Sequence, residues 1–358
     1  MSIQKTSLHE AHLVLKAKMA PFAGFDMPLQ YTSVKEEVLA VRNEAGVFDV
    51  SHMGEFLVTG PDAVNFVDYI MTNDFKNAEV KKAVYSPLCR DNGTVIDDLI
   101  AYKLAEDRIL ICVNASNIDK DWNWISSKTK NFKIDLKNLS DDYSLLAIQG
   151  PKAEPILKSL GILGNSDFPY YSILETAHEG EKLIIARTGY TGEDGFEVFS
   201  SHNFAKKFWN QLLNLGVKPC GLASRDVLRL EVCYPLYGHE LTDEVTPLDA
   251  GLAWTVKLEK DNFIGKAALA EYKPRFQLVK LSLEKGIPRE GYAILDSNNN
   301  TIGKVTSGTM SVVTGKGIAM ALVEKDKNPK DKKYLINIRA ANYEANYHSK
   351  AFITGGHK

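Results

Sequence analysis

The hydrophobic and polar positions of this chain follow two patterns, which meet near residue 272. Before that point, short apolar runs alternate with stretches whose apolar residues recur at the spacing of an amphipathic helix. After it only short alternating runs remain, at residues 278–283, 292–295, 303–307 and 335–339. The first pattern predicts mixed helices and sheets. The second predicts a small all-β barrel or roll that begins near Tyr272–Pro274.

Two units of the first region share one construction, in which a strand, a Gly-Pro pair and a helix follow one another. In the first unit, residues 55–58 lead to Pro61 and a helix through Ile70. In the second, residues 144–148 lead to Pro151 and a helix through Leu160. We expect each proline at the first helical position, where its missing N–H costs nothing. The similarity indicates two sheet-and-helix layers of related construction without establishing a duplication.

Further elements flank these two units. Ser33 and Glu36 form a capping box in front of a helix that we expect Gly46 to end, and a strand follows at 47–50. Between the units, the pattern predicts a hairpin, a third strand and a helix that carries Trp122 and Ile125, with the strands at 83–88, 94–104 and 109–113. This order is typical of an α+β layer rather than a doubly wound sheet.

Composition narrows the class of protein. The chain has 358 residues, enough for two or three domains, and 44% of them are hydrophobic. Its 43 basic and 45 acidic residues leave a net charge of -2, which argues against a general nucleic-acid binder. No apolar run approaches the roughly 20 residues of a membrane span, and the N-terminus lacks the features of a signal peptide. We therefore expect a cytoplasmic protein that binds neither nucleic acid nor a membrane.

The sequence motifs support neither a metal site nor a nucleotide site. The four cysteines show no C-x-x-C spacing, so free thiols are expected. The pair His9 and His12 is one residue short of a zinc-binding H-E-x-x-H motif. A glycine follows Lys316 where a P-loop needs Ser or Thr, and the G-x-x-G-x-x-G run at 189–195 is not a dinucleotide fingerprint. We expect no metal and no nucleotide.

The segment Arg187–Glu197 carries the first functional signal. It follows the apolar run 183–186 and contains three glycines, so it reads as a strand, a wide turn and a second strand. A plain hairpin requires neither the aromatic Tyr190 nor the carboxylate Glu197 at its margins. A flat polycyclic ligand with an amidine-like edge needs both, a ring to stack on and an acceptor for its N–H groups. The structural alternative is a glycine-rich hairpin without a ligand.

Two adjacent acids, Asp97 and Asp98, lie within a predicted strand. Neighbouring strand residues point to opposite faces, so each carboxylate sits on an apolar stripe: Asp97 with Leu99, Asp98 with Ile100. A buried carboxylate needs a cation or hydrogen-bond donors. The periodicity does not say which of the two is functional, and a salt-bridged strand acid is the structural alternative.

Two arginines, Arg225 and Arg229, are four residues apart and share one face of a predicted helix at 222–232. Pairing with Asp226 and Glu231 would make them a structural lattice of salt bridges. An arginine fork also suits a carboxylate or carbonyl group of a ligand, which is the functional alternative.

Together these segments resemble the T-protein of the glycine cleavage system, an aminomethyltransferase family. The resemblance runs in order along nearly the whole chain, through blocks at 18–28, 48–53, 95–100 with 113–115, 187–197, 221–231 with 236–238 and 246–247, and 302–308. Two departures lie towards the C-terminus, where residues 310–315 lack an expected proline and Ala351 stands in place of another. They put the local shape of the last domain in doubt.

The resemblance implies an α+β fold, a three-domain cloverleaf around a central opening. It comprises two mixed antiparallel-sheet and helix domains and a small all-β barrel. Residues 1–50 with 140–272 would form a discontinuous folate-binding domain, 51–139 an inserted ferredoxin-like domain, and 273–358 the C-terminal barrel.

The resemblance also implies a site. The family's catalytic aspartate falls on Asp98, and its folate-holding glutamate and arginine fall on Glu197 and Arg225. The remaining candidates would stack on the folate, hydrogen-bond to it or supply an apolar wall, and they are Tyr190, Asn114, Tyr85, Tyr171, Met53 and Leu88.

The implied reaction transfers a one-carbon unit from the aminomethyl-lipoyl arm of the H-protein to tetrahydrofolate, the co-substrate, and releases ammonia. The product is 5,10-methylenetetrahydrofolate. One alternative is a folate-dependent demethylase of a free methylated amine or sulfonium compound, which would need no lipoyl carrier. Another is a non-enzymatic folate-binding protein of iron–sulfur maturation. The run Glu231–Glu240 has the wrong spacing for the motif of that second class.

Overall fold

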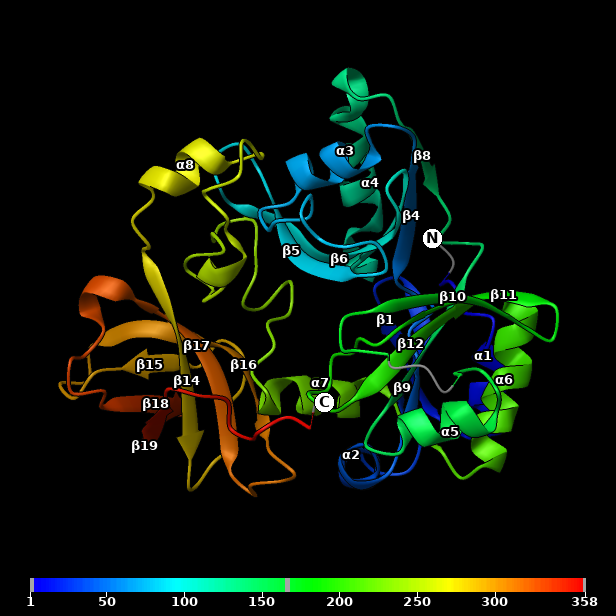
Figure 1. Cartoon of the computed structure of the whole chain (residues 1–358). Coiled ribbons are helices and arrows are strands. Elements are labelled where there is room, and N and C mark those ends of the chain that lie inside the picture. The colour runs from blue at the N-terminus through cyan, green and yellow to red at the C-terminus, as the bar shows by residue number, and fades with distance from the viewer. Residues whose placement is uncertain (1–2, 165–167, 357–358) are drawn as a thin grey trace.

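The computed structural model describes residues 3–164 and 168–356. Three larger sheets are arranged around the centre of the molecule (Figure 1): a five-stranded sheet, a six-stranded sheet and a closed barrel of six strands. This arrangement confirms the α+β class with a C-terminal barrel. The more exact division at residues 50/51, 139/140 and 272/273 stays a prediction.

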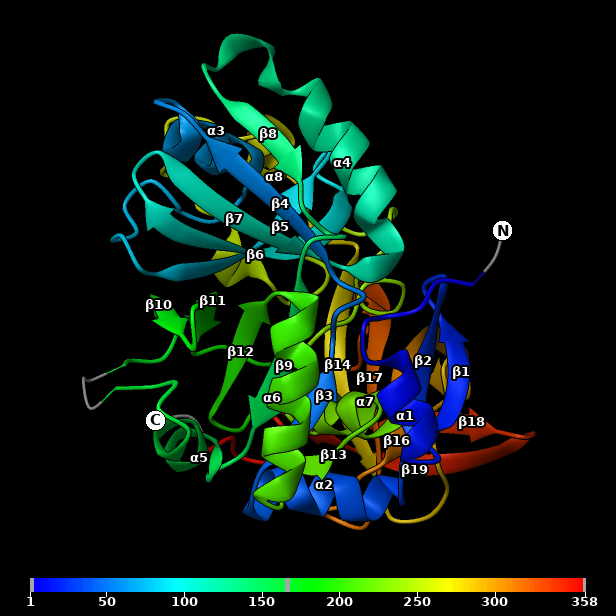
Figure 2. The same cartoon turned by 90° about the vertical axis from the view of Figure 1, so that its right-hand side faces the viewer.

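The six-stranded sheet joins distant parts of the chain. Its strands, in spatial order, are β10 (Ile173–His178), β11 (Glu181–Ala186), β12 (Gly195–Ser200), β9 (Ser144–Gln149), β3 (Gly46–Asp49) and β13 (Lys218–Pro219). Helix α6 (His202–Asn214) runs along its outer face (Figure 2), and Trp209 and Phe208 pack from it against Phe196 and Ile148. The apolar face of α6 therefore closes one core.

Shorter elements cover the rest of this unit. Helices α1 (His9–Val14), α2 (Val34–Asn43) and α5 (Ala153–Ser159) pack around the sheet, and the hairpin of β1 (Lys18–Phe22) and β2 (Phe25–Gln30) adds a small sheet. Ser33 caps α2 as predicted, because its side chain accepts a hydrogen bond from the Glu36 N–H at 3.1 Å.

The five-stranded sheet is antiparallel and has helices on one face. Along the chain its elements are β4 (Gly54–Thr59), α3 (Ala63–Ile70), β5 (Ala83–Cys89), β6 (Val95–Ala105), β7 (Arg108–Val113), α4 (Ile118–Ser127) and β8 (Asp135–Asn138). The spatial order is β5-β6-β7-β4-β8. Strands β6, β7, β4 and β8 have the ferredoxin-like order, to which β5 adds an edge strand. Because α3 and α4 cover one face, the other is free to meet the six-stranded sheet.

The barrel follows a short helix, α8 (Lys266–Glu271). Its strands are β14 (Phe276–Leu283), β15 (Ala293–Leu295), β16 (Thr301–Met310), β17 (Gly317–Glu324), β18 (Tyr334–Ile338) and β19 (Ala341–His348). Alternation found β14, β15, β16 and β18 but missed β17 and β19. Strand β17 is buried on both faces, so its sequence does not alternate, and β19 is largely polar.

Two expectations about helix ends are wrong. Helices α3 and α5 begin at Ala63 and Ala153, so Pro61 and Pro151 lie two residues ahead, in the turn before the cap residue. Helix α2 ends at Asn43, and Gly46 instead opens β3. A side chain at Gly46 would meet Val41 at 2.6 Å, so this glycine serves close packing rather than helix termination.

Helix α7 (Leu222–Glu231) connects the six-stranded sheet to the barrel through its last residue. The Glu231 carboxylate, which is fully buried, accepts hydrogen bonds from Arg42 at 2.7 Å and from the backbone N–H groups of Val312 and Val313 at 3.0 and 3.1 Å. A proline at either valine position could not donate this bond. The Glu231 carbonyl also accepts from Phe352 and Ile353. Both segments that depart from the family pattern are therefore held by one residue.

We predict that Glu231→Gln lowers the free energy of unfolding by about 3 kcal/mol, because Arg42 would lose a buried anionic partner. Chemical denaturation followed by circular dichroism measures the change. The matched control is Glu324→Gln, which breaks an exposed pair with Lys327 and should have little effect. Equal stability of the two variants would contradict this role for Glu231.

Candidate functional site

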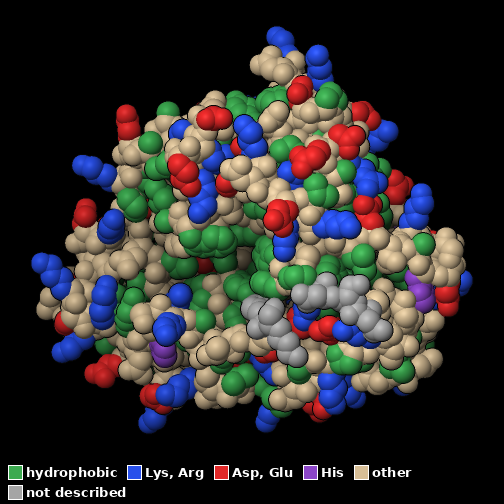
Figure 3. Space-filling view, viewed as in Figure 1, with side chains coloured by type: hydrophobic (Ala, Val, Ile, Leu, Met, Phe, Trp, Pro, Cys, Tyr) green, Lys and Arg blue, Asp and Glu red, His purple; other side chains and the backbone are tan. Residues whose placement is uncertain are grey.

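A cavity of about 790 Å³ opens where the three sheets meet. Figure 3 shows it as a hollow in the middle of one face, lined mainly by hydrophobic side chains. Strands β5, β6 and β7, the loop at 189–190, helix α7 with the segment 232–237, and β14 of the barrel all contribute to its wall. Segments far apart in the sequence thus form one site.

Asp98 lies in the wall of this cavity, on the face of β6 that points away from the helices. Its Oδ2 accepts a hydrogen bond from the Tyr85 hydroxyl at 2.9 Å, and its Oδ1 accepts one from the Asn114 amide at 2.9 Å. Burial, reinforced by the charge of Asp97, raises the pKa of Asp98 to about 7. The carboxyl group can therefore change protonation state near neutral pH.

Asp97 points to the opposite face, as strand alternation predicts, and is fully buried. Its carboxylate accepts hydrogen bonds from the Asn114 amide at 2.8 Å and the Asn117 amide at 2.7 Å. The single Asn114 side chain thus joins the two adjacent acids. Ile96, expected on the Asp98 face, instead packs with Leu99 because a β-bulge interrupts the pairing of β5 and β6 beside it.

Glu197 and Arg225 face the cavity from the six-stranded sheet and α7. Both donors to Glu197, the hydroxyls of Thr188 and Tyr102, bind its Oε2, and Oε1 has no hydrogen-bond partner in the described part of the chain. Burial raises the pKa of Glu197, while Thr188 and Arg225 oppose the shift. A carboxylate oxygen is left to accept from a ligand.

The guanidinium of Arg225 stacks on Tyr190 at 4.6 Å from the ring centre. Among residues 3–164 and 168–356 it makes neither an ion pair nor a side-chain hydrogen bond, and burial lowers its pKa. Arg229, one helical turn away, is instead saturated by Asp226, Glu240, Ser307 and the Tyr234 carbonyl. Only Arg229 follows the salt-bridge alternative. The N–H groups of the Arg225 guanidinium therefore remain available for a ligand.

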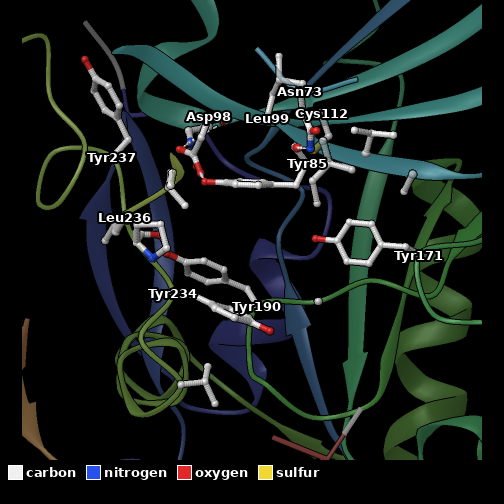
Figure 4. Close-up of a pocket in the computed structure, with 18 of the residues that line it drawn as sticks. Asn73, Tyr85, Asp98, Leu99, Cys112, Tyr171, Tyr190, Tyr234, Leu236 and Tyr237 are labelled. Atoms are coloured by element: carbon white, nitrogen blue, oxygen red, sulfur yellow. Dashed lines mark hydrogen bonds between the residues drawn. The ribbon is translucent and has the colours of Figure 1, made fainter. Parts of the chain in front are cut away.

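Tyrosines form the remaining polar edge of the cavity (Figure 4). Tyr85 reaches in from the five-stranded sheet with its hydroxyl towards Asp98, and Tyr190 lies on the opposite side. The hydroxyl of Tyr171 points into the space between them. Tyr190 is fixed by a hydrogen bond from its hydroxyl to the Pro235 carbonyl. The structure brings these residues together with Asn114 and Met53, which also line the cavity.

Leu88 does not belong to this wall, and its assignment to the site is wrong. It pairs with Asp97 in the β5–β6 ladder, so it faces the helices and is fully buried in the core of the five-stranded sheet. Sequence reasoning also missed several lining residues, namely Cys112, Tyr170, Tyr234, Tyr237, Trp254 and Lys280. Trp254 stacks on Tyr85 with ring centres 6.0 Å apart, although it is 58% exposed. An isolated tryptophan in a loop was its only sequence signal.

The three glycines of the segment 189–195 serve different structural purposes. A side chain at Gly189 or Gly195 would collide with the buried Gln149, at 2.0 and 2.5 Å. Only Gly192 has a left-handed backbone, with φ of +81°. The motif therefore accommodates a buried amide beneath the loop as well as making a turn.

The histidines near the N-terminus are structural. His12 Nε2 lies 2.9 Å from the Asp49 carboxylate and His9 Nε2 lies 2.9 Å from that of Asp26. Within the described ranges no cluster of three or more His, Cys, Asp or Glu side chains could hold a metal ion. All four cysteines are free thiols. No helix in these ranges is long and apolar enough to cross a membrane.

We predict opposite stability effects for two substitutions on α7. Arg225→Met should leave the free energy of unfolding unchanged or higher, because it removes a desolvated cation that has no ion partner in the part of the chain that the structure describes. Arg229→Met should lower it by about 3 to 5 kcal/mol, because Glu240 would remain buried without a cation, held only by the Leu236 N–H and the Thr306 hydroxyl. Denaturant titration of both variants decides the matter. A large loss of stability in Arg225→Met would show that Arg225 serves the fold.

Protein-family models and known relatives match most of this chain. The model of the GCVT N-terminal domain matches residues 8–260, and that of the glycine cleavage T-protein C-terminal barrel domain matches residues 277–353. The aminomethyltransferase of Thermotoga maritima is 48% identical over 330 residues, which is 90% of each chain. That of Thermotoga neapolitana is 41% identical over 99% of this chain and 98% of its own.

A solved structure has the same fold. The crystal structure of the glycine cleavage system aminomethyltransferase T from Bartonella henselae superposes with a TM-score of 0.94. It is 33% identical and covers 99% of both chains. The family resemblance carried by the sequence motifs is thereby confirmed, and this chain belongs to the glycine cleavage T-protein family of aminomethyltransferases.

Proposed function

We propose that this chain transfers a one-carbon unit from the aminomethyl-lipoyl arm of the H-protein to tetrahydrofolate, with release of ammonia. The product is 5,10-methylenetetrahydrofolate, and the reaction takes place in the cytoplasm. Family membership supports the aminomethyltransferase activity. The observation that carries the proposal for this site is Asp98, a carboxyl group with a pKa of about 7 in a cavity that also presents Glu197 and Arg225.

The cavity fits a reduced folate in size and chemistry. Its volume of about 790 Å³ lies within the range of sites for drug-sized ligands. Glu197 Oε1 is available to accept N–H bonds from the amine edge of a pterin, and the Arg225 fork suits a carbonyl or carboxylate. The rings of Tyr85, Tyr171 and Tyr190 supply flat surfaces and hydroxyl groups, and Met53 adds an apolar contact.

Asp98 is suited to the charge that the reaction creates. Overall, the transferred carbon loses its bonds to sulfur and to the amine nitrogen and gains bonds to N5 and N10 of the folate. The two protons displaced from these nitrogens leave with ammonia and the thiol. Positive charge develops on the carbon as ammonia departs, and a nearby carboxylate stabilises it. Asp98 also has two neutral donors, so its charge is oriented without being neutralised by a cation.

Much of the rate would come from alignment. Folate and the carrier's arm are both large, and holding them in register replaces a bimolecular encounter by a local one. The mainly apolar lining lowers the local dielectric constant, which strengthens the interaction between Asp98 and the developing cation.

The direct test is ammonia release from the aminomethyl carrier, measured with and without tetrahydrofolate. We expect folate-dependent release and labelled methylene transfer that requires lipoylated H-protein. Transfer from a free methylated amine or sulfonium compound without the carrier would overturn the proposal in favour of the demethylase. Folate binding without any transfer would favour a non-enzymatic protein.

We predict that Asp98→Asn reduces turnover far more than folate affinity, because the asparagine keeps the shape but loses the charge. Steady-state kinetics and folate titration separate the two quantities. The matched control is Glu197→Gln, which should weaken folate binding by about tenfold through loss of a charged hydrogen bond. Unchanged turnover in Asp98→Asn would remove Asp98 from the mechanism.

The pH dependence of turnover should follow Asp98. Because its carboxylate is the active form, turnover should rise with pH through about 7 as the proton leaves. The hydrogen bond from Tyr85 lowers the pKa of Asp98, so Tyr85→Phe should move this acid limb to higher pH. Tyr102→Phe, which removes a donor to Glu197 instead, is the control and should leave the limb in place. The same shift in both variants would contradict the assignment.

A further inference from the structure

A third acid lies behind Asp98, on the helix side of the five-stranded sheet. Asp121 of α4 is fully buried, and no N–H or O–H group in residues 3–164 and 168–356 donates to either of its carboxyl oxygens. Asp121 lies one turn of α4 beyond Asn117, whose side-chain amide donates to Asp97 Oδ1 at 2.7 Å, so the carboxyl groups of Asp121 and Asp97 meet on the same side of the helix. Neither Asp97 nor Asp121 touches the cavity.

Two carboxyl groups in contact away from water cannot both stay ionised, because the repulsion of like charges adds to the cost of burial. One of them must hold a proton. Asp97 already accepts three hydrogen bonds, from the Asn114 backbone N–H at 3.2 Å and the side-chain amides of Asn114 and Asn117. These donors favour its charged form. Asp121 has no such donors, so the proton belongs to Asp121.

The charged groups around Asp121 do not alter this assignment. Lys120, its neighbour on α4, directs its ammonium to the Ile96 carbonyl at 2.6 Å and the Tyr237 hydroxyl at 2.7 Å. Asp243 lies 3.8 Å from that ammonium, and Arg90 pairs with Asp243. Asp119 of the same helix is exposed, and Asp98 faces the cavity. Burial, followed by the charge of Asp97, raises the pKa of Asp121 to about 11.

We propose that Asp121 is a positioning residue of the reaction proposed above: its neutral carboxyl group donates a hydrogen bond to Asp97, which in turn orients Asn114 towards Asp98. Because Asp97 also accepts a hydrogen bond from Asp121, it does not need the Asn114 amide for itself alone. That amide donates to both Asp97 Oδ1 and Asp98 Oδ1, at 2.8 and 2.9 Å. The chain Asp121–Asp97–Asn114–Asp98 thus connects a core helix to the cavity.

Two substitutions separate this role from simple packing. Asp121→Asn keeps a neutral donor, so kcat should stay within about threefold of the wild type, a change of well under 1 kcal/mol, and the acid limb should not move. Asp121→Leu removes the donor from a side chain of similar volume. Asp97 should then draw Asn114 away from Asp98, which lowers kcat by about tenfold and moves the acid limb to higher pH. The KM for folate should change little in Asp121→Asn.

A readout independent of activity tests the protonation itself. The infrared difference spectrum between the wild type and Asp121→Asn at pH 8 should contain the carbonyl band of one protonated carboxylic acid. Subtraction removes the contributions of other acids with raised pKa values, such as Glu55. Asp119→Asn, an exposed acid on the same helix, should show no such band. Thermal unfolding of each variant verifies that it is folded.

Three results would overturn the proposal. The first is the absence of a lost carboxylic-acid band in Asp121→Asn. The second is an acid limb that moves to lower pH in that variant, because removal of a negative charge would lower the pKa of Asp98. The third is wild-type kcat and acid limb in Asp121→Leu. Failure of the wild type to transfer the one-carbon unit would sink the proposed function instead, and the infrared result would still decide the state of Asp121.

Discussion

The cavity depends on charged side chains that are removed from water without a partner of opposite charge among the described residues. Asp98 is held by a tyrosine hydroxyl and an amide, and Arg225 rests on an aromatic ring. Each arrangement fixes the position of the charged group but supplies no opposite charge. A buried charge of this kind costs free energy in a site of low dielectric constant. The cost is offset elsewhere in the fold. In the proposed reaction, these are the groups that a substrate would neutralise.

The compensation lies mainly on α7 and at its end. Arg229 and Glu231 are buried, and each is fully engaged, Arg229 with Glu240 and Ser307, and Glu231 with Arg42 and the barrel loop at 311–313. These contacts lock the six-stranded sheet to the barrel. Arg225 lies one helical turn before Arg229 on the same helix, so its guanidinium is held in place although its own charge has no anionic partner among the described residues.

The acids beneath the cavity follow the same logic at a smaller scale. Asp97 would be an isolated buried charge without the two asparagine amides, and its negative charge is what raises the pKa of Asp98 beyond the effect of burial. The carbon that receives positive charge in the proposed reaction therefore meets a carboxylate whose pKa is raised in part by Asp97, a residue outside the cavity. A pKa near neutrality suits a group that works at neutral pH.

The sequence alone determined the local elements and the family. Alternation placed Asp97 and Asp98 on opposite faces of one strand, and helical spacing put Arg225 beside Arg229, because both patterns depend only on neighbours along the chain. The sequence also predicted the barrel, but not its strands β17 and β19. Strand β17 is buried on both faces and β19 is mostly polar, so neither shows the alternation. The choice between Asp97 and Asp98, by contrast, came from resemblance and remains a prediction.

Only the tertiary structure decided which residues meet. Leu88 is apolar like many pocket residues, but it pairs with Asp97 in the sheet, so its side chain points into the core and not into the cavity. Trp254 and Lys280 reach the cavity from segments that are remote in the chain. The difference between Arg225 and Arg229 arises from partners on other elements, and so does the contact that we propose between Asp121 and Asp97. Burial and charge pairing are properties of packing between distant segments, which periodicity along a single segment does not record.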